Sequence, residues 1–178
     1  MQALWLQVPE DFLEDRRRRG LDKKDELWDG VLHMSPVPGN AHQRVPPRLV
    51  EALRLIAKRN GLEIFFDATG IFGSNQDWRI PDLSFVRPHQ SSPRGLESAE
   101  IVVEIVSPTD ESRKKFEFYS AVGVREIWIV EPDTWVVDLF SLVEGSYIQG
   151  DASYVLGVRL ETANGELRVH DGATVIVV

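Results

Sequence analysis

The segment from Ile101 to Pro132 constrains the fold of this chain more than any other stretch. It opens with an apolar run over residues 101–106, interrupted only by Glu104, which predicts a strand buried on both faces. A helix is predicted from Pro108 to Ala121, because proline suits the first turn of a helix. Glu126–Val130 predicts a second strand. A strand, a helix and a strand in about thirty residues form a βαβ unit, so the two strands should be parallel.

Glu104 and Lys115 are the ionisable residues of this unit that point to a function. A carboxylate in a buried strand is costly unless it is neutralised, hydrogen-bonded or bound to a cation. Lys115 shares one stripe of the predicted helix with Phe118 and Tyr119. Its side chain can therefore reach the end of the preceding strand and share a pocket with Glu104. The alternative is an ordinary pair between Lys115 and Glu111 on a solvated helix face.

Composition narrows the class of protein. The chain has no cysteine, which excludes disulfides, cysteine-ligated zinc and a thiol nucleophile. Its 178 residues, 43% of them hydrophobic, are enough for a core, and no repeat or second boundary is visible, so one domain over residues 1–178 is expected. The start lacks the pattern of a signal peptide and no stretch approaches about eighteen apolar residues. We therefore expect no membrane span and a cytoplasmic location.

The net charge of −8 is unevenly distributed. Residues 1–115 carry 17 basic and 18 acidic side chains, whereas residues 116–178 carry 3 and 10. A nucleic acid would therefore meet the N-terminal two thirds, although basic runs are usually solvated helix faces and the acidic total opposes strong non-specific DNA affinity. The basic residues concerned are Arg16 to Arg19, Lys23, Lys24, Arg44, Arg48, Arg54, Lys58 and Arg59.

Local patterns predict the remaining elements. The apolar and turn patterns predict a helix over Pro9–Arg19, hairpin strands at 26–28 and 31–34, a helix over Ala41–Asn60 and a strand over Leu83–Val86. The second helix has Pro46 and Pro47 near its start, so it is expected to begin either at Ala41 or near Pro46. Residues 89–97 are expected to be a polar linker.

The chain after Pro132 is expected to be mostly β. A hairpin arm over Thr134–Leu142 should pair with the strand before it, and short strands follow. We therefore predict an α/β fold with a mixed sheet, helices on its faces, a core over about residues 20–142 and a β-rich C-terminal extension over about 143–178.

Three further polar residues precede the βαβ unit. Glu26 begins the first hairpin, and local pattern alone favours an exposed strand end. His42 lies in the second predicted helix, where a lone histidine is more often structural than a ligand. Asp82 follows Pro81 directly before a strand, a place that tolerates proline because its missing N–H can fall outside the ladder.

Taken together, these residues resemble a known family. The motifs that follow one another in order are Glu26-Leu27-Trp28-Asp29-Gly30, His42, Ile80-Pro81-Asp82, Val103 to Pro108, Lys115, Tyr119 and Gly123 to Val130. This combination is similar to the Uma2 family of restriction-endonuclease-like proteins, common in bacteria, within the PD-(D/E)XK nuclease superfamily. The resemblance runs from about Pro9 to Leu142. It implies a restriction-endonuclease-like core.

The resemblance also implies roles for individual residues. Asp82 would be the central metal-binding carboxylate and Glu104 the second acid, with the backbone carbonyl of Ile105 as a further ligand. Glu26 matches the acid that many members carry ahead of the core. The superfamily lysine two positions after Glu104 is absent, since Val106 stands there. Lys115 matches a lysine that takes its place in similar sequences, and as a catalytic residue it would hold the attacking water or the phosphate.

These roles predict a metal-dependent endonuclease. Two carboxylates and a carbonyl suit Mg²⁺, with Mn²⁺ as a substitute, and such an ion would activate water and stabilise charge on a phosphodiester. The expected partner is DNA, and a homodimer is expected because enzymes that cut duplex DNA often pair their sites. Two alternatives stay open: a nuclease that acts on RNA or repair intermediates, and a non-catalytic interaction module that keeps the fold.

Overall fold

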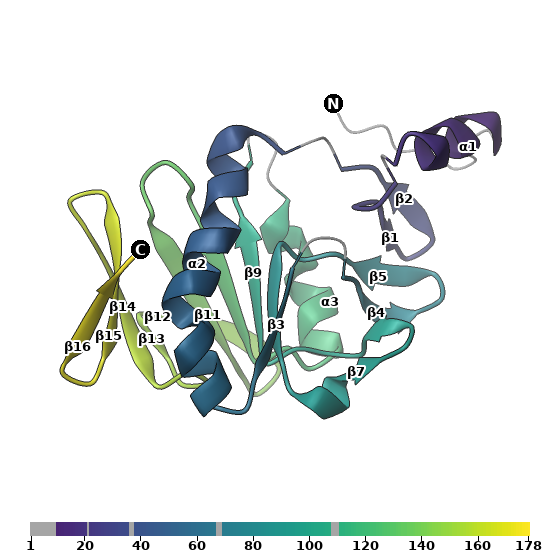
Figure 1. The fold of residues 1–178 in the computed structure, drawn as a ribbon. Coiled ribbons are helices and arrows are strands. Elements are labelled where there is room, and N and C mark those ends of the chain that lie inside the picture. The colour runs from purple at the N-terminus through teal and green to yellow at the C-terminus, as the bar shows by residue number, and fades with distance from the viewer. Residues whose placement is uncertain (1–9, 21, 36–37, 67–68, 108–110) are drawn as a thin grey trace.

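The structure is a computed structural model that describes residues 10–20, 22–35, 38–66, 69–107 and 111–178 (Figure 1). Its centre is a mixed six-stranded sheet in which only β9 and β10 are parallel neighbours. This confirms the predicted α/β class and the mixed sheet. In spatial order the strands are β12 (Ser146–Gly150), β11 (Val137–Val143), β10 (Glu126–Val130), β9 (Ile101–Ile105), β6 (Leu83–Val86) and β3 (Glu63–Phe66).

The predicted βαβ unit is present, with a shorter helix than expected. β9 and β10 are buried along their whole lengths and pair in parallel, Glu104 opposite Ile129. Residues 108–110 lie outside the described residues. Helical structure begins only with the 3₁₀ turn η2 (Ser112–Lys115) and continues as α3 (Phe116–Ala121), so the prediction of helix at Glu111 is wrong. No side chain caps either segment. Contacts of their buried side chains with the rest of the fold stabilise both segments, and local helix propensity does not reflect such contacts.

The two faces of the central sheet are covered by different helices (Figure 1). Side chains alternate along a strand, so Ile101, Val103 and Ile105 of β9 pack on the side of α2 (Asn40–Arg59). Val102 packs on the opposite side, with Phe118 and Tyr119 of α3. Glu104 has the same parity as Val102 and therefore points toward α3.

Helix α2 begins at Asn40, next to the expected start at Ala41 and before the alternative start near Pro46. It runs through Pro46 and Pro47, so the prediction of a start near Pro46 is wrong. The two prolines lack the N–H groups that would bond to the carbonyls of residues 42 and 43, which makes this helix costly in local terms. Its buried stripe of Val45, Leu49 and Leu53 against the sheet offsets that cost.

A second small sheet lies beside the first and carries the N-terminal hairpin (Figure 1). Its strands, in spatial order, are β2 (Val31–His33), β1 (Glu26–Trp28), β5 (Asp77–Arg79), β4 (Ile71–Ser74), β8 (Gly95–Leu96) and β7 (Ser91–Ser92). The hairpin was predicted correctly, and α1 (Glu10–Arg18) precedes it. The prediction of a polar linker over residues 89–97 is wrong, because η1 (Pro88–Gln90), β7 and β8 fold there and Leu96 is buried against β4.

The C-terminal region forms a third sheet, which confirms the predicted β-rich extension. Its order is β13 (Ala152–Ser153), β14 (Val158–Ala163), β15 (Glu166–Asp171) and β16 (Thr174–Val177). Leu160, Leu167 and Val169 of this sheet join the core on the side of α2. The division into a core of residues 20–142 and an extension of 143–178 stays a prediction. Among the described helices, none has the length and apolarity needed to cross a membrane.

Candidate active site

Asp82 stands directly before β6, beside the C-terminal end of β9. β6 and β9 are antiparallel neighbours, with Leu83 opposite Val103. The N–H of Ile105 donates a hydrogen bond of 2.9 Å to Asp82 Oδ2. The strand pairing and this bond bring Asp82 next to the segment Glu104–Ile105, as the sequence predicted from neighbouring strands.

Glu104 is buried and held by two side chains of the following helical segment. Both of its carboxylate oxygens lie 3.1 Å from Lys115 Nζ. The hydroxyl of Tyr119 donates a hydrogen bond of 2.5 Å to Glu104 Oε1. The predicted shared pocket of Glu104 and Lys115 is therefore present. The alternative pairing of Lys115 with Glu111 is wrong, because Lys114 makes that pair.

Glu26 is buried, so its interpretation as an exposed strand end is wrong. Its Oε1 accepts hydrogen bonds from the N–H of Ile80 at 2.8 Å and from Lys115 Nζ at 2.8 Å. Its Oε2 accepts from Trp28 Nε1 at 2.7 Å. Strand pairing explains the burial, since β1 lies between β2 and β5 and turns Glu26 inward. Lys115 thus bridges two glutamates that lie 78 positions apart in the chain.

Asp82 has side-chain partners of its own, His42 and Lys24, that sequence reasoning did not assign to the site. Nε2 of His42 lies 3.1 Å from Asp82 Oδ2, and Nζ of Lys24 lies 3.4 Å from Oδ1. His42 occupies the first turn of α2. Its place in the family motif was the signal that it belongs to the site, and the same holds for Tyr119. Lys24 had no such signal beyond its basic neighbourhood.

The acids of this group differ in their protonation energetics. Burial raises the pKa of Glu104 to about 7, and the charges of Asp82 and Glu26 add to the rise against the opposing effect of Lys115. Burial also acts to raise the pKa of Asp82, but His42, Lys24 and the N–H of Ile105 outweigh it and lower that pKa. Among these acids, Glu104 is therefore the one whose pKa is raised, and Asp82 is the one whose pKa is lowered.

The two proton donors around Glu104 are held in their protonated forms. Burial opposes the charge of Lys115, but the carboxylates of Glu104 and Glu26 prevail and raise its pKa. Burial and the same two carboxylates raise the pKa of the Tyr119 hydroxyl well above its usual value. At neutral pH, Lys115 is a cation and Tyr119 a neutral donor.

The oxygens present fit a hard divalent ion that binds together with water and substrate. Among the residues that the structure describes, no group of three His, Asp or Glu side chains is arranged to hold a metal ion. An ion beside Asp82, Glu104 and the Ile105 carbonyl would take no more than two carboxylates from the chain. Mg²⁺ commonly binds in this way and completes its shell with waters and substrate phosphates. The metal roles of these residues stay predictions.

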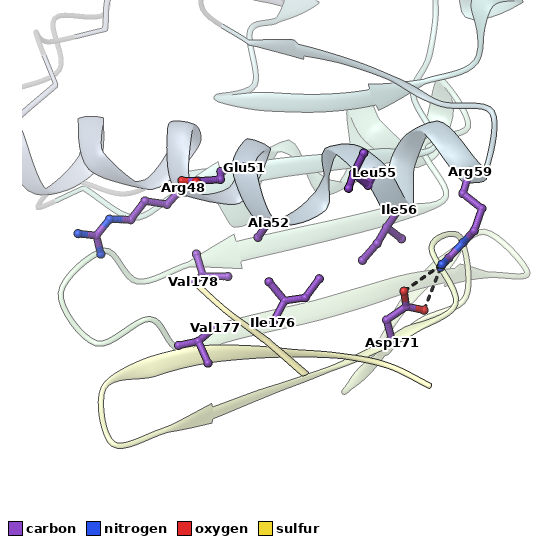
Figure 2. Close-up of a pocket in the computed structure, with 10 residues that line it drawn as sticks. All are labelled: Arg48, Glu51, Ala52, Leu55, Ile56, Arg59, Asp171, Ile176, Val177 and Val178. Carbon is purple, nitrogen blue, oxygen red and sulfur yellow. Dashed lines mark hydrogen bonds and ion pairs between the residues drawn. The ribbon is translucent and has the colours of Figure 1, made fainter. Parts of the chain in front are cut away.

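A pocket elsewhere on the molecule is separate from this cluster (Figure 2). It lies between α2 and β16 and has a volume of about 590 Å³. None of the carboxylates described above lines it. Its walls are mixed, with apolar residues such as Leu55, Ile56 and Ile176 beside the charged residues Arg48, Glu51, Arg59 and Asp171. The candidate active site is therefore the carboxylate cluster at the end of β9.

Comparisons with known proteins identify the family and the fold. The family model Uma2, described as "Putative restriction endonuclease", matches residues 9–160. A crystal structure of "a putative nuclease belonging to DUF820" from Anabaena variabilis is similar, with a TM-score of 0.57 and 18% sequence identity. That likeness covers 72% of this chain and 76% of the other, and it shows the fold. No curated protein matches the chain.

Proposed function

This chain belongs to the Uma2 family, and on that premise we propose that it is a Mg²⁺-dependent endonuclease that hydrolyses phosphodiester bonds of DNA. One observation carries the proposal. Two buried carboxylates, Glu26 and Glu104, and the partly buried Asp82 come from separate parts of the chain and meet at the end of β9, where Lys115 bridges the two glutamates. Such crowding is costly to a fold, and functional sites are where proteins maintain it.

Some residues of the site would bind the metal ion, and others would orient a metal ligand or contact the substrate. Asp82, Glu104 and the carbonyl of Ile105 would bind Mg²⁺, or Mn²⁺ in its place. When bound, the ion would lower the pKa of a water molecule and stabilise the charge that develops on the phosphate. His42 orients Asp82 through the contact at 3.1 Å. Lys24, whose side chain is 27% exposed, is placed to contact a phosphate oxygen.

Basic residues near the cluster support DNA as the partner. Lys23 and Arg44 are exposed, and each lies within two positions of a residue that contacts Asp82. Positive side chains at the rim of a nuclease site attract the phosphate backbone without reading sequence. RNA presents the same phosphates, so the choice of DNA rests on the family description and needs a direct assay.

The proposal is tested by titrating Mn²⁺ into the protein and measuring the heat of binding. We expect Asp82→Asn and Glu104→Gln to abolish the binding that the unaltered protein shows. Glu126→Gln is the matched control, because Glu126 is a buried glutamate on the neighbouring strand. Cleavage of plasmid DNA and of RNA is then compared. Equal behaviour of all four proteins in both assays would favour an interaction module, and preferential cleavage of RNA would change the substrate.

We further propose that two copies pair through β16, the edge strand of the C-terminal sheet. The N–H of Val178 bonds to β15, so by the alternation of antiparallel ladders Val175 and Val177 direct their backbone groups to the open edge. Both side chains are about half exposed, and residues 174–178 carry no charge. A two-fold pairing centred on Ile176 would match Val175 of each copy with Val177 of the other, free of like-charge repulsion along the strand.

Sedimentation velocity checks this pairing. We expect the unaltered protein to sediment as a dimer and Val177→Lys as a monomer. Ile148→Lys is the matched control, because Ile148 is a similarly exposed residue on β12, at the edge of the central sheet. The pairing is refuted by a monomeric unaltered protein or by a Val177→Lys variant that remains dimeric.

A further inference from the structure

We propose that Lys115 is a built-in cation that takes the place of a second metal ion, so that the site binds one divalent ion. The inference rests on the proposed function and specifies its metal stoichiometry. It assigns Glu26 a role as the counter-charge of Lys115 and excludes it as a metal ligand.

The contacts of Lys115 place its ammonium group between two carboxylates. An ammonium group has three N–H donors. Nζ has three carboxylate oxygens within reach, Glu26 Oε1 at 2.8 Å and the two oxygens of Glu104 at 3.1 Å. Its side chain is 11% exposed. Lys115 therefore lies between the two glutamates, which take at least two of its three N–H donors.

The contacts of Glu26 leave it poorly suited to bind a metal. Oε1 already accepts from Ile80 and Lys115, and Oε2 accepts from the indole of Trp28. A divalent ion would have to displace these donors, and the backbone N–H of Ile80 would then be left unsatisfied in a buried place. Asp82 also accepts from a backbone N–H, that of Ile105, but its two side-chain partners, His42 and Lys24, are partly exposed.

The charges of the cluster balance with one divalent ion. Glu26, Asp82 and Glu104 contribute three negative charges when ionised, and Lys115 contributes one positive charge. One divalent ion brings that sum to zero, and with the partly exposed Lys24 beside Asp82 counted as well, a second ion would leave three positive charges at the site.

The substitution Lys115→Ala should create a position for a second metal ion where the ammonium group of Lys115 was. It removes the cation and leaves a space bounded by Glu26 and Glu104, two carboxylates that then lack a counter-charge. A second divalent ion supplies that charge and the volume of the lost ammonium. Lys115→Arg is the matched control, because arginine keeps a fixed positive charge in the same place.

The experiment counts Mn²⁺ ions by calorimetry and by the electron paramagnetic resonance signal of bound Mn²⁺. We expect one ion for the unaltered protein and for Lys115→Arg, and two spin-coupled ions for Lys115→Ala. Two ions in the unaltered protein, or one in a folded Lys115→Ala variant, would overturn the inference and leave the proposed function standing. No ion in the unaltered protein, with or without DNA, would instead remove the metal-dependent function itself.

Glu26→Gln provides a second test that does not need Lys115→Ala to fold. Because Glu26 acts through Lys115, we expect the variant to keep one ion, with an affinity reduced by no more than about tenfold to a hundredfold, as for outer-shell changes. Complete loss of Mn²⁺ binding in a folded Glu26→Gln protein would identify Glu26 as a ligand and overturn the inference.

Discussion

Two buried glutamates on neighbouring parallel strands have opposite surroundings. Glu126 is the first residue of β10 and Glu104 the fourth of the five residues of β9. Each is less than 5% exposed. Glu126 accepts hydrogen bonds from Ser153, Trp128 and the N–H of Val155, which are all neutral donors. Glu104 instead shares Lys115 with a second glutamate and lies close to a third carboxylate.

The difference shows that burial of an acid does not by itself indicate function. Glu126 is a satisfied acceptor that ties the segment Ser153–Val155 to the central sheet. Glu104 lies near the carboxyl end of its strand, the end at which ligands bind in sheets with parallel strands, and like charges crowd it there. Unfavourable crowding that the fold maintains is the signal that separates a site from a structural hydrogen-bond network.

The largest expected effect comes from replacing each of the two glutamates in turn with uncharged glutamine. Glu104→Gln should lower the rate of DNA cleavage by about 10³-fold, because it removes a proposed metal ligand, and should leave stability nearly unchanged or raised. Glu126→Gln should leave cleavage within a few-fold of the unaltered rate. It should lower the free energy of unfolding by about 1–3 kcal/mol, because an amide cannot satisfy three donors. Urea unfolding and plasmid cleavage measure the two effects, and the reverse pattern would refute the comparison.

The next effect isolates the cation that the two functional glutamates share. Lys115→Met should lower the free energy of unfolding by about 3–5 kcal/mol at pH 8, because Glu26 and Glu104 then lack their buried partner. Adding Glu26→Gln should restore part of that loss, as expected for groups in contact. Urea unfolding of the two single variants and the double variant gives the coupling. Additive losses would show that the ion pairs do not act as one unit.

Much of the fold was accessible from the sequence because it depends on local patterns. The buried runs of β9 and β10, the hairpin turn at Asp29–Gly30 and the C-terminal strands follow periodicities of apolar and turn residues. The errors arose where tertiary contacts override local preference. Pro46 and Pro47 are tolerated within α2 because its buried stripe packs on the sheet, and residues 89–97 fold because Leu96 is buried beside Ile71.

The site was accessible only in part. Glu104 and Lys115 were placed near one another from helix spacing and Asp82 joined them through the family resemblance, and the structure brings the three together with Glu26. The burial of Glu26 depends on the pairing of β1 with β5, a contact between segments about fifty residues apart, which local pattern does not contain. Lys24 reaches Asp82 across a similar separation.

The third effect is a pH dependence of stability that only one of the two glutamates should cause. The pKa of Glu104 is about 7 in the folded protein, above the ordinary value of 4.5 for a glutamate. Between these values the folded state holds a proton that the unfolded state has released, so the free energy of unfolding falls as pH rises. The fall from this group is about 3 kcal/mol between pH 4.5 and 7 in metal-free buffer.

Comparison of variants isolates this contribution. His33 has a lowered pKa because of burial, and it contributes a slope of opposite sign near pH 6. The difference between the unaltered protein and Glu104→Gln removes that background. We expect this difference to grow with pH up to about 7 and then level off, whereas Glu126→Gln should keep the slope of the unaltered protein. A pH-independent difference for Glu104→Gln would contradict the raised pKa.

The smallest expected effect comes from removing the hydroxyl group that donates a hydrogen bond to each glutamate. Tyr119 donates to Glu104 at 2.5 Å and Ser153 donates to Glu126 at 2.7 Å, and both are buried. Ser153→Ala should cost about 1 kcal/mol of stability and leave Mn²⁺ affinity unchanged, because Glu126 keeps the N–H of Val155.

Tyr119→Phe should have the complementary result. Without the hydroxyl, Glu104 is oriented by Lys115 alone, so Mn²⁺ should bind about tenfold more weakly, as for other outer-shell changes. The free energy of unfolding should change little. Glu104 is protonated part of the time near pH 7, and a neutral carboxyl group depends less on hydrogen-bond donors than a carboxylate does. Calorimetric titration and urea unfolding of both variants at pH 7 make the measurement. If Ser153→Ala weakened Mn²⁺ binding as much as Tyr119→Phe, the two glutamates would belong to one coupled network, and the distinction between a functional and a structural buried acid would fail in this fold.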